Sequence, residues 1–318
     1  MTAYIIRRII QAVFVLLLVS IIVFISLHIL PGDPIYMLMT SEEMNQKPEE
    51  EIQALRHEYG LDKPLIVQYF DWLGGVLHGD FGTSIRFRFS VGGLMLERIP
   101  LTFHLGILAF IIAHVLGIAA GVICAVRRGT WLDTVVTVFA NFGITIPIFW
   151  LGIMMIYLFS LYLHWLPVMG YTSPFTDFWM STRQLVMPVI CLAIMPMASA
   201  ARQTRSSMLE VMHQDYIRTA WSKGLKERAI IIKHAMKNGL IPVLTLVGLH
   251  LSGIIGGSVL IETVYAIPGV GRLAVDSLFN RDYLVIQGVT ILVAGVIVLV
   301  NLIVDIAYGW LDPRVRYR

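Results

Sequence analysis

The sequence predicts an all-α integral membrane protein with six membrane-crossing helices. Of its 318 residues, 57% are hydrophobic and only 14% are charged, and the mean hydropathy is +0.76. Soluble domains carry about 25% charged residues, so this chain has too few to cover a water-soluble surface. Six segments are apolar over the roughly 20 residues that a bilayer-crossing helix needs. They are residues 9–30, 102–126, 134–163, 185–203, 239–261 and 286–309.

The first apolar segment, Ile9 to Leu30, follows Arg7 and Arg8 as a signal peptide would. It is too long for the apolar part of a signal peptide and no small-x-small cleavage site follows it, so it is predicted to be a retained span. The third segment is long enough to be tilted or kinked, and Pro147 is its predicted break point because proline removes a helical hydrogen bond.

The spans and the polar segments between them divide the chain into three parts. Residues 1–30 are a cytoplasmic N-terminus and first span, residues 31–101 an extracytoplasmic segment, and residues 102–318 a five-helix core. Within 31–101, Pro48 and three glutamates precede apolar residues spaced three and four apart, which predicts a short amphipathic helix. The core includes a cytoplasmic loop at residues 202–238.

The distribution of lysine and arginine predicts the orientation. With the N-terminus in the cytoplasm, 15 of the 24 basic residues fall inside, whereas 15 of the 21 acidic residues fall outside. The bias is steepest at Arg127-Arg128 and in the tail with Arg314, Arg316 and Arg318. Both termini are therefore expected in the cytoplasm.

The cytoplasmic loop is predicted to hold two short helices joined at a glycine. Asp215 to Leu225 has an acidic start, a basic end and Gly224 at the position that follows a helix end, and Lys226 to Lys237 mixes isoleucines with cations. Such a loop is suited to docking on another molecule. The alternative is a basic helix resting on anionic lipid.

Several classes of function lack support in the sequence. A net charge of +3 without a long basic run argues against nucleic-acid binding, and no Walker motif indicates ATP hydrolysis. Cys124 and Cys191 have no ligand-spaced neighbours and are expected to be small core residues. Histidines within spans, namely His104, His114 and His250, form no metal motif and are expected to be hydrogen-bonded packing residues.

Three further residue groups in or near the spans are interpreted as structural. Glu262 and Asp305 lie near span ends, where the cost of a charge is small. Gly253, Gly256 and Gly257 lie three and four apart, which favours close helix packing. We expect these glycines to face a partner permease or the fourth span.

The loop also resembles a known family. Tyr216 to Ala220, Gly224-Leu225, His234 to Asn238 and Leu240 to Pro242 are similar to the EAA loop of bacterial ABC-importer permeases, in the version of the dipeptide, oligopeptide and nickel branch. Arg218-Thr219-Ala220 stands where the general pattern has Glu-Ala-Ala, which is similar to this branch. Other matching motifs, in chain order, are Pro31 to Pro34, Tyr59 to Leu65, Gly79 to Ser84, Pro268 to Arg272 and Asp312 to Arg314.

The resemblance implies the transmembrane fold of a type I ABC importer and assigns roles to particular residues. The ATPase-coupling residues would be Asp215, Tyr216, Arg218, Thr219, Ala220, Lys223, Gly224 and Leu225. Residues supporting the coupling loop would be Arg205, His234, Asn238 and Pro242. Contacts with a binding protein, or a gate, would involve Gly79, Asp80, Gly82, Pro268, Gly269 and Gly271. A tight turn is the alternative for these last segments.

By the same resemblance, the chain is a translocation subunit in a bacterial inner membrane and not itself an enzyme. Its expected partners are a second homologous permease, two ATP-binding subunits that hold ATP and Mg, and an extracytoplasmic solute-binding protein. The chain itself is expected to bind no cofactor and no metal. Its substrate would be a dipeptide or oligopeptide.

Other substrates and another class of protein stay open at this point. Nickel or a metal chelate, glutathione and oligosaccharides are alternatives within the branch, because the binding protein sets much of the selectivity. A self-sufficient secondary transporter is the alternative class, although no inverted repeat or mid-membrane carboxylate favours it. An intramembrane enzyme is a third, for which no HExxH or Ser–Lys pairing is visible.

Overall fold

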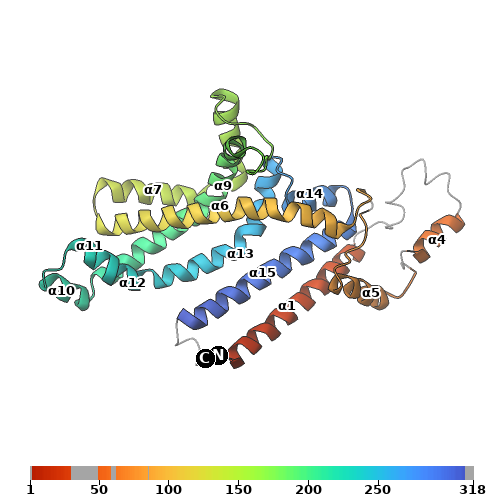
Figure 1. Ribbon diagram of the computed structural model, residues 1–318, viewed down its shortest axis with the longest axis horizontal. Coiled ribbons are helices and arrows are strands. Elements are labelled where there is room, and N and C mark those ends of the chain that lie inside the picture. The colour runs from red at the N-terminus through yellow and green to blue at the C-terminus, as the bar shows by residue number, and fades with distance from the viewer. Residues whose placement is uncertain (1, 30–48, 59–61, 85, 312–318) are drawn as a thin grey trace. The chain divides into compact units, whose positions relative to one another are not determined.

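The computed structural model describes residues 2–29, 49–58, 62–84 and 86–311, and it is built of helices joined by short connections (Figure 1). In chain order the helices are α1 (Thr2–Ile29), α4 (Glu49–Glu58), α5 (Leu65–Leu77), α6 (Val91–Val126), α7 (Trp131–Thr145), α8 (Ile148–Met155), the π-helix η1 (Ile156–Tyr162), α9 (Phe178–Met212), α10 (Asp215–Ser222), α11 (Glu227–Ala229), the π-helix η2 (Ile230–Ala235), α12 (Met236–Gly239), α13 (Ile241–Val264), α14 (Val270–Phe279) and α15 (Tyr283–Leu311).

The six predicted spans correspond to helices that are long and apolar enough to cross a membrane. Single helices supply four of them, at Tyr4–Ser26, Val91–Val126, Phe178–Met212 and Tyr283–Ile306. Two bent pairs supply the others, Trp131–Thr145 with Ile148–Tyr162 and Glu227–Gly239 with Ile241–Leu251. The predicted fifth span, residues 239–261, matches the second half of the latter pair, which belongs to α13 (Ile241–Val264), whereas the first half falls in the predicted cytoplasmic loop. When each bent pair is counted as one span, the described residues hold the predicted six.

The predicted break in the third span is confirmed at Pro147. Helix α7 ends at Thr145, Ile146 is extended with φ −73° and ψ 126°, and α8 begins after Pro147, so that the two halves meet at 107°. A residue before proline is driven from the helical to the extended region by the proline ring, which accounts for the position of the break.

Several helices extend beyond the predicted spans. Helix α6 begins at Val91 and passes through Pro100, and α9 runs on to Met212 into the segment that was expected to be loop. An apolar run marks only the part of a helix that lies in lipid, whereas the helix continues as long as its backbone hydrogen bonds and its packing persist. The predicted amphipathic helix is confirmed as α4, but α5 and α14 were not predicted.

The chain forms two compact units, each of which is described by itself. Unit 1 comprises residues 1–100 and 272–302, and unit 2 comprises residues 101–271 and 303–318. In unit 1, α1 packs against α5 through Phe24, whose ring lies 5.4 Å from that of Tyr69, and Ser20 Oγ lies 2.7 Å from Tyr69 Oη. Unit 1 also contains a hydrogen bond of 2.5 Å from Ser84 Oγ to Asp282 Oδ2.

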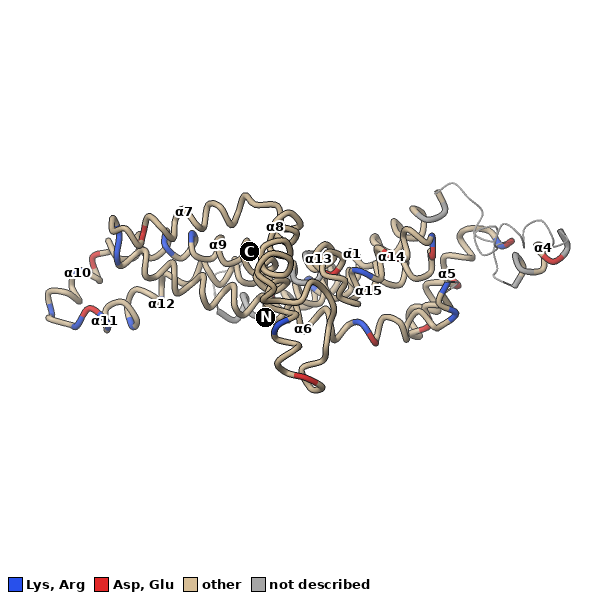
Figure 2. Tube along the Cα trace, turned by 90° about the horizontal axis from the view of Figure 1, so that it is seen from above, with Lys and Arg blue, Asp and Glu red and all other residues tan. Residues whose placement is uncertain are grey.

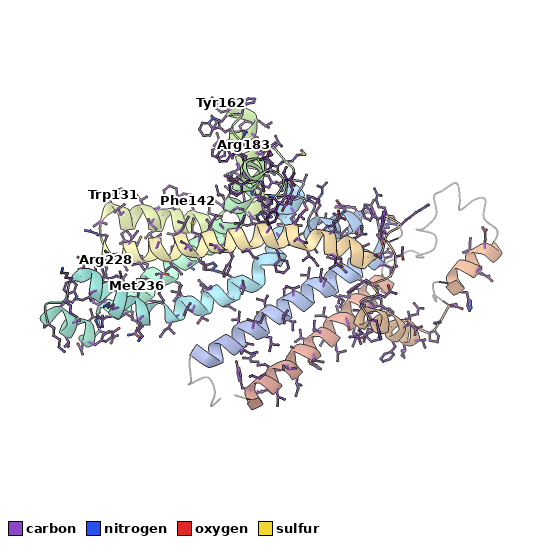
Figure 3. All side chains as sticks on the ribbon, viewed as in Figure 1. Trp131, Phe142, Tyr162, Arg183, Arg228 and Met236 are labelled. Carbon is purple, nitrogen blue, oxygen red and sulfur yellow. The ribbon has the colours of Figure 1, made fainter. Side chains whose placement is uncertain are left out.

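The core of unit 2 lies between α6, α8, α9 and the end of α13. Its fully buried members include Leu105, Met187, Cys191 and Tyr265. The outward faces are apolar as well: Figure 3 shows Trp131, Phe142 and Tyr162 pointing outward, and these side chains are 71%, 60% and 71% exposed. Apolar residues on both faces are what a helix surrounded by lipid requires.

Close helix packing in unit 2 occurs at Gly117 and Gly121, whereas of the predicted glycines the packing of Gly257 lies outside the described residues. A Cβ added to Gly117 would lie 2.5 Å from the Met197 carbonyl oxygen, and one added to Gly121 would lie 2.5 Å from that of Ala201. These two glycines, four apart on α6, let α9 approach. At Gly253 and Gly256 an added Cβ would meet nothing within 4 Å among the described residues, so they do not pack against the fourth span.

Some predicted motifs lie outside the described residues. These are Pro31 to Pro34, Tyr59 to Leu61 and Asp312 to Arg314.

Candidate functional site

Helix α10 presents one buried and one exposed face. Ile217 is 1% exposed and Ala220 is buried, and both belong to a small core with Ala125 of α6, Met208 of α9 and Ile230 of η2. These two apolar residues, three apart, fix one side of the helix to the rest of unit 2. The other side is left to solvent or to another molecule.

The exposed face of α10 carries large and charged side chains. Tyr216 is 41% and Trp221 47% exposed, and Asp215 forms only a loose ion pair of 3.6 Å with Arg218. Of the other predicted coupling residues, Lys223 is exposed and Thr219 Oγ1 donates to the Asp215 carbonyl oxygen at 2.9 Å. An aromatic surface next to charged groups on a rigid base is typical of a protein contact.

The end of α10 confirms the predicted role of Gly224 as the residue after the helix cap. Its φ is +73°, its N–H donates to the Trp221 carbonyl oxygen at 2.9 Å, and the Leu225 N–H donates to that of Ala220 at 3.4 Å. This pair of bonds is the Schellman motif, which needs a left-handed residue and therefore favours glycine. A Cβ added at Gly224 would meet nothing within 4 Å among the described residues.

The second predicted helix of the loop is present, and it contains a π-helical segment. Helix α11, η2 and α12 follow one another from Glu227 to Gly239, and a bend of 55° leads into α13. Asn238 Nδ2 donates to Tyr216 Oη at 2.9 Å and so ties α12 to α10. His234 is half-buried within η2, and Pro242 lies in the first turn of α13.

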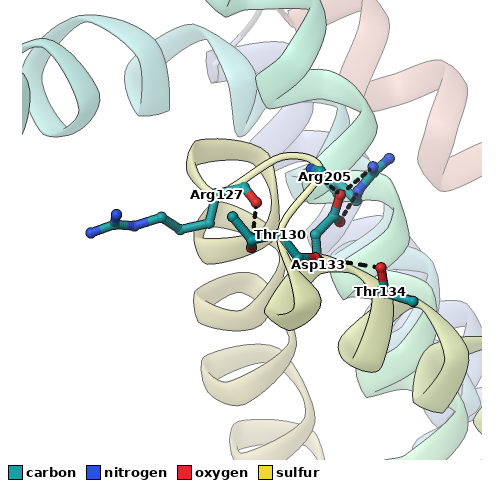
Figure 4. A network of polar contacts seen from close by, with 6 residues as sticks. Arg127, Thr130, Asp133, Thr134 and Arg205 are labelled. Atoms are coloured by element: carbon teal, nitrogen blue, oxygen red, sulfur yellow. Dashed lines mark hydrogen bonds and ion pairs between the residues drawn. The ribbon is translucent and has the colours of Figure 1, made fainter.

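Arg205 connects this region to α7 through a residue that the sequence did not single out (Figure 4). Its Nε lies 2.6 Å from Asp133 Oδ1 and its Nη2 lies 2.9 Å from Oδ2. The Asp133 side chain is 8% and the Arg205 side chain 32% exposed. Asp133 also accepts from the Gly129 N–H at 3.1 Å, so one carboxylate joins α9 to the turn between α6 and α7.

Many charged residues of unit 2 gather around α10. Figure 2 shows Lys, Arg, Asp and Glu around α10 and α11 and at the adjoining end of α7. Arg228 and Met236, labelled in Figure 3, mark the helices beside it. Helices α6, α7 and α9 therefore end near a charged region that contains the candidate docking helix α10.

The glycine motifs predicted to contact a binding protein fall into two different settings. In unit 1, Gly79 and Gly82 both have φ of +81°, and Asp80 Oδ1 accepts from the Gly82 N–H at 2.9 Å, which forms a tight turn after α5. In unit 2, Pro268 is exposed, but Gly269 and Gly271 are buried.

The span histidines are hydrogen-bonded, as expected for packing residues. His104 Nδ1 lies 3.1 Å from Tyr171 Oη. His114 Nδ1 donates to the Phe110 carbonyl oxygen at 2.8 Å, and His114 Nε2 lies 3.1 Å from His250 Nδ1. Across the described residues no group of three His, Cys, Asp or Glu side chains is placed to hold a metal ion.

Comparison with known proteins identifies the family. Residues 117–317 match the family model described as "Binding-protein-dependent transport system inner membrane component", and residues 1–106 match the model of the N-terminal region of such membrane components. The chain belongs to the family of inner membrane components of binding-protein-dependent transport systems. It is thus a multi-pass translocation subunit of the inner membrane and not an ATPase, and it works with ATPase and solute-binding partners.

Similar proteins match over the whole chain. It is 41% identical over 320 residues to the oligopeptide transport system permease protein AppB of Bacillus subtilis and 39% identical over 341 residues to the dipeptide transport system permease protein DppB of Escherichia coli, with all of each chain covered. It is 43% identical to a putative peptide transport system permease protein of Brucella abortus, also over all of both chains.

A solved structure has a similar fold. A crystal structure of an amino acid ABC transporter with histidines matches with a TM-score of 0.50 and 15% identity, over 70% of this chain and 94% of that chain. At this identity the likeness shows the fold alone.

Proposed function

We propose that this chain is one of two membrane-spanning halves of an ATP-driven importer of dipeptides or oligopeptides. Both of its termini lie in the cytoplasm, and so does α10. The observation that carries the proposal is helix α10, which is held by buried Ile217 and Ala220 and leaves Tyr216 and Trp221 exposed beside a rigid helix end.

In the proposed mechanism, α10 seats in a cleft of an ATP-hydrolysing partner. Closure of the partners around ATP displaces α10. The displacement reaches the spans through the buried contacts and hydrogen bonds between α10 and its neighbouring helices. Met208 and the Arg205–Asp133 ion pair link it to α9 and α7, and the Tyr216–Asn238 hydrogen bond links it to α12 and so to α13. A packed helical block passes on displacement as a unit, because such interfaces have discrete arrangements.

The proposed assembly supplies what a single chain of this size does not. Six spans are too few to enclose a route for a peptide, so a second homologous permease completes the pathway. Two ATP-binding subunits hold ATP and Mg on the cytoplasmic side. On the opposite side a solute-binding protein contacts exposed turns, for which Gly79, Asp80 and Pro268 are the accessible members of the predicted set.

Peptides are the proposed substrate because the three relatives described above bear names of peptide, oligopeptide or dipeptide permeases at 39–43% identity. No contact among the described residues favours nickel, a metal chelate or glutathione over peptides.

Replacing Gly224 with aspartate is expected to uncouple ATP hydrolysis from transport. The complex should assemble in normal amounts, because the site is open and aspartate tolerates a left-handed backbone. Transport should fall at least about tenfold, the equivalent of about 1.4 kcal/mol, because a polar side chain now projects from the docking surface. The measurement is ATPase activity and uptake by the reconstituted complex, with binding protein and a panel of peptides, nickel and glutathione.

Gly129 offers a matched control. It has φ +77° and open space around it, as Gly224 does, but it lies in the turn between α6 and α7. Gly224→Asn and Gly129→Asn therefore carry the same backbone cost, and only the first is expected to impair transport. Normal uptake by both Gly224 variants would refute the docking role of α10. If nickel or glutathione stimulated the ATPase activity and peptides did not, that ligand would replace peptides as the proposed substrate.

A further inference from the structure

A single threonine hydroxyl joins three helices at the far end of α13. Thr102 Oγ1 of α6 donates to Glu262 Oε1 of α13 at 2.8 Å and accepts from the Val270 N–H, at the start of α14, at 2.9 Å. Thr102 is 1%, Glu262 0% and Val270 2% exposed. The hydroxyl uses its one donor and one of its acceptor sites in this bridge.

The turn after α13 folds closely around the Glu262 carboxylate. A Cβ added to Gly269 would lie 2.4 Å from the carboxylate carbon, and one added to Gly271 would lie 2.9 Å from Oε2 and 2.6 Å from Val259 Cα. The Ile267 N–H donates to the Glu262 carbonyl oxygen at 2.8 Å. Both glycines are therefore explained by the approach of backbone to a buried carboxylate rather than by contact with a partner.

Tyr265 extends the same joint to α8 and to the segment before α9. Its hydroxyl donates to the Gly152 carbonyl oxygen at 3.2 Å, and its own carbonyl oxygen accepts from the Gly170 N–H at 3.2 Å. Tyr265 is 1% exposed. Separating these groups would break hydrogen bonds of buried amide, hydroxyl and carboxylate groups, which is costly, so they are expected to stay together.

Helix α13 connects this joint to the docking region. It has 24 residues, which is about 36 Å at the helical rise of 1.5 Å, and only Leu240 separates its first residue from α12. We infer that Glu262, acting through Thr102 and the Gly269–Gly271 turn, is a positioning residue that makes the outer end of α13 a fixed pivot. The inner end then swings when α10 is displaced. This inference rests on the proposed function.

Removal of the Thr102 hydroxyl tests the pivot. Thr102→Val has nearly the same shape but neither hydrogen bond, whereas Thr102→Ser keeps the hydroxyl. In the assembled complex with binding protein and peptide, Thr102→Val is expected to retain stimulated ATPase activity but to transport several-fold less peptide per ATP. Thr102→Ser should behave like the wild type. If Thr102 had a purely structural role, Thr102→Val would reduce the amount of complex without changing the peptide transported per ATP, and this result would overturn the inference. Equal loss of transport per ATP in Thr102→Val and Thr102→Ser would overturn it as well.

Distance measurements test the same point without disturbing the joint. Spin labels at Ile107 and Leu260 form the outer pair and report on the joint, since each lies within five residues of Thr102 or Glu262. Labels at Ile123 and Leu244 form the inner pair and report on the opposite ends of α6 and α13; all four side chains are between 46% and 52% exposed. The outer distance is expected to stay constant between the ATP-free and ATP-bound complex while the inner distance changes. A change in the outer distance as large as the change in the inner distance would overturn the proposed pivot.

The two proposals fail in different ways. If uptake by the wild-type complex needs no ATP, or Gly224→Asp leaves transport unchanged, the proposed function fails. If Gly224→Asp uncouples the complex but Thr102→Val matches the wild type, only the pivot fails.

Discussion

Replacing Asp133 with arginine is expected to abolish transport and to lower the stability of the chain. The substitution places two guanidinium groups where a carboxylate now holds Arg205 through two hydrogen bonds of 2.6 and 2.9 Å. Removing one partner of a fully buried ion pair costs about 3–5 kcal/mol. Because Arg205 is one-third exposed, about 2 kcal/mol is the better estimate for loss of the carboxylate alone. Repulsion between the two cations adds to this loss.

The measurements are thermal stability of the detergent-solubilised chain and uptake by the reconstituted complex. The double variant Asp133→Arg with Arg205→Asp should recover part of the lost stability and part of the lost uptake. A double-mutant cycle would quantify this recovery as a favourable coupling between the two residues. The chain supplies its own control: Asp71 pairs with Lys63 at 2.7 Å, but both side chains are about half exposed, so Asp71→Arg should change stability little. Equal effects at positions 71 and 133 would contradict the structural role of the buried pair.

Replacing Gly121 with leucine is expected to prevent folding of unit 2. The Cβ alone would stand 2.5 Å from the Ala201 carbonyl oxygen and 2.6 Å from Thr204 Cβ. The nearest atom is a backbone carbonyl oxygen of α9, which cannot move aside as a side chain could. Helices α6 and α9 must therefore separate to make room. Overpacking costs about 1–3 kcal/mol where side chains can yield, and more is expected here. Size-exclusion chromatography of the solubilised chain should show aggregated rather than monodisperse protein.

Gly256→Leu is the matched control for Gly121→Leu. It is also a glycine inside a spanning helix, but an added Cβ meets nothing within 4 Å in the described part of the chain. The isolated chain should therefore fold normally. If Gly256→Leu chains aggregated as Gly121→Leu chains do, the packing difference between the two helices would be refuted. A folded Gly256→Leu chain that fails to assemble would instead indicate that α13 faces the second permease.

The local features of the candidate site were predictable from the sequence, whereas its long-range contacts were not. Gly224 follows a short segment with an acidic start and a basic end, and these signals act within one helix and its cap. Asp133 and Arg205 lie 72 residues apart, and the local sequence around either residue does not reveal that the other is its ion-pair partner. The one available signal was an isolated aspartate at the start of an apolar segment.

The difference between local signals and long-range contacts also explains why the exact span ends and the packed glycines were not predicted. Apolar runs located the six spans, but α6 begins at Val91 and α9 ends at Met212 because tertiary packing continues each helix past its apolar stretch. Gly117 and Gly121 have the same small-residue spacing as the glycines of α13, and nothing in the sequence tells which pair is packed within the chain. Glu262 was interpreted as a carboxylate near water, yet it is fully buried because a distant threonine and two glycines enclose it.

Unit 1 combines residues 1–100 with residues 272–302, and this has a consequence for biosynthesis. The hydrogen bond from Ser84 to Asp282 joins residues 198 positions apart, and Arg86 bonds to Asn280 across a similar interval. Ribosomes add about 5–20 residues per second, so Ser84 waits roughly 10–40 s for its partner to be synthesised. During that time the first hundred residues sit in or beside the membrane with an unfinished surface. Insertion of the last span is therefore the event that completes the first part of the protein.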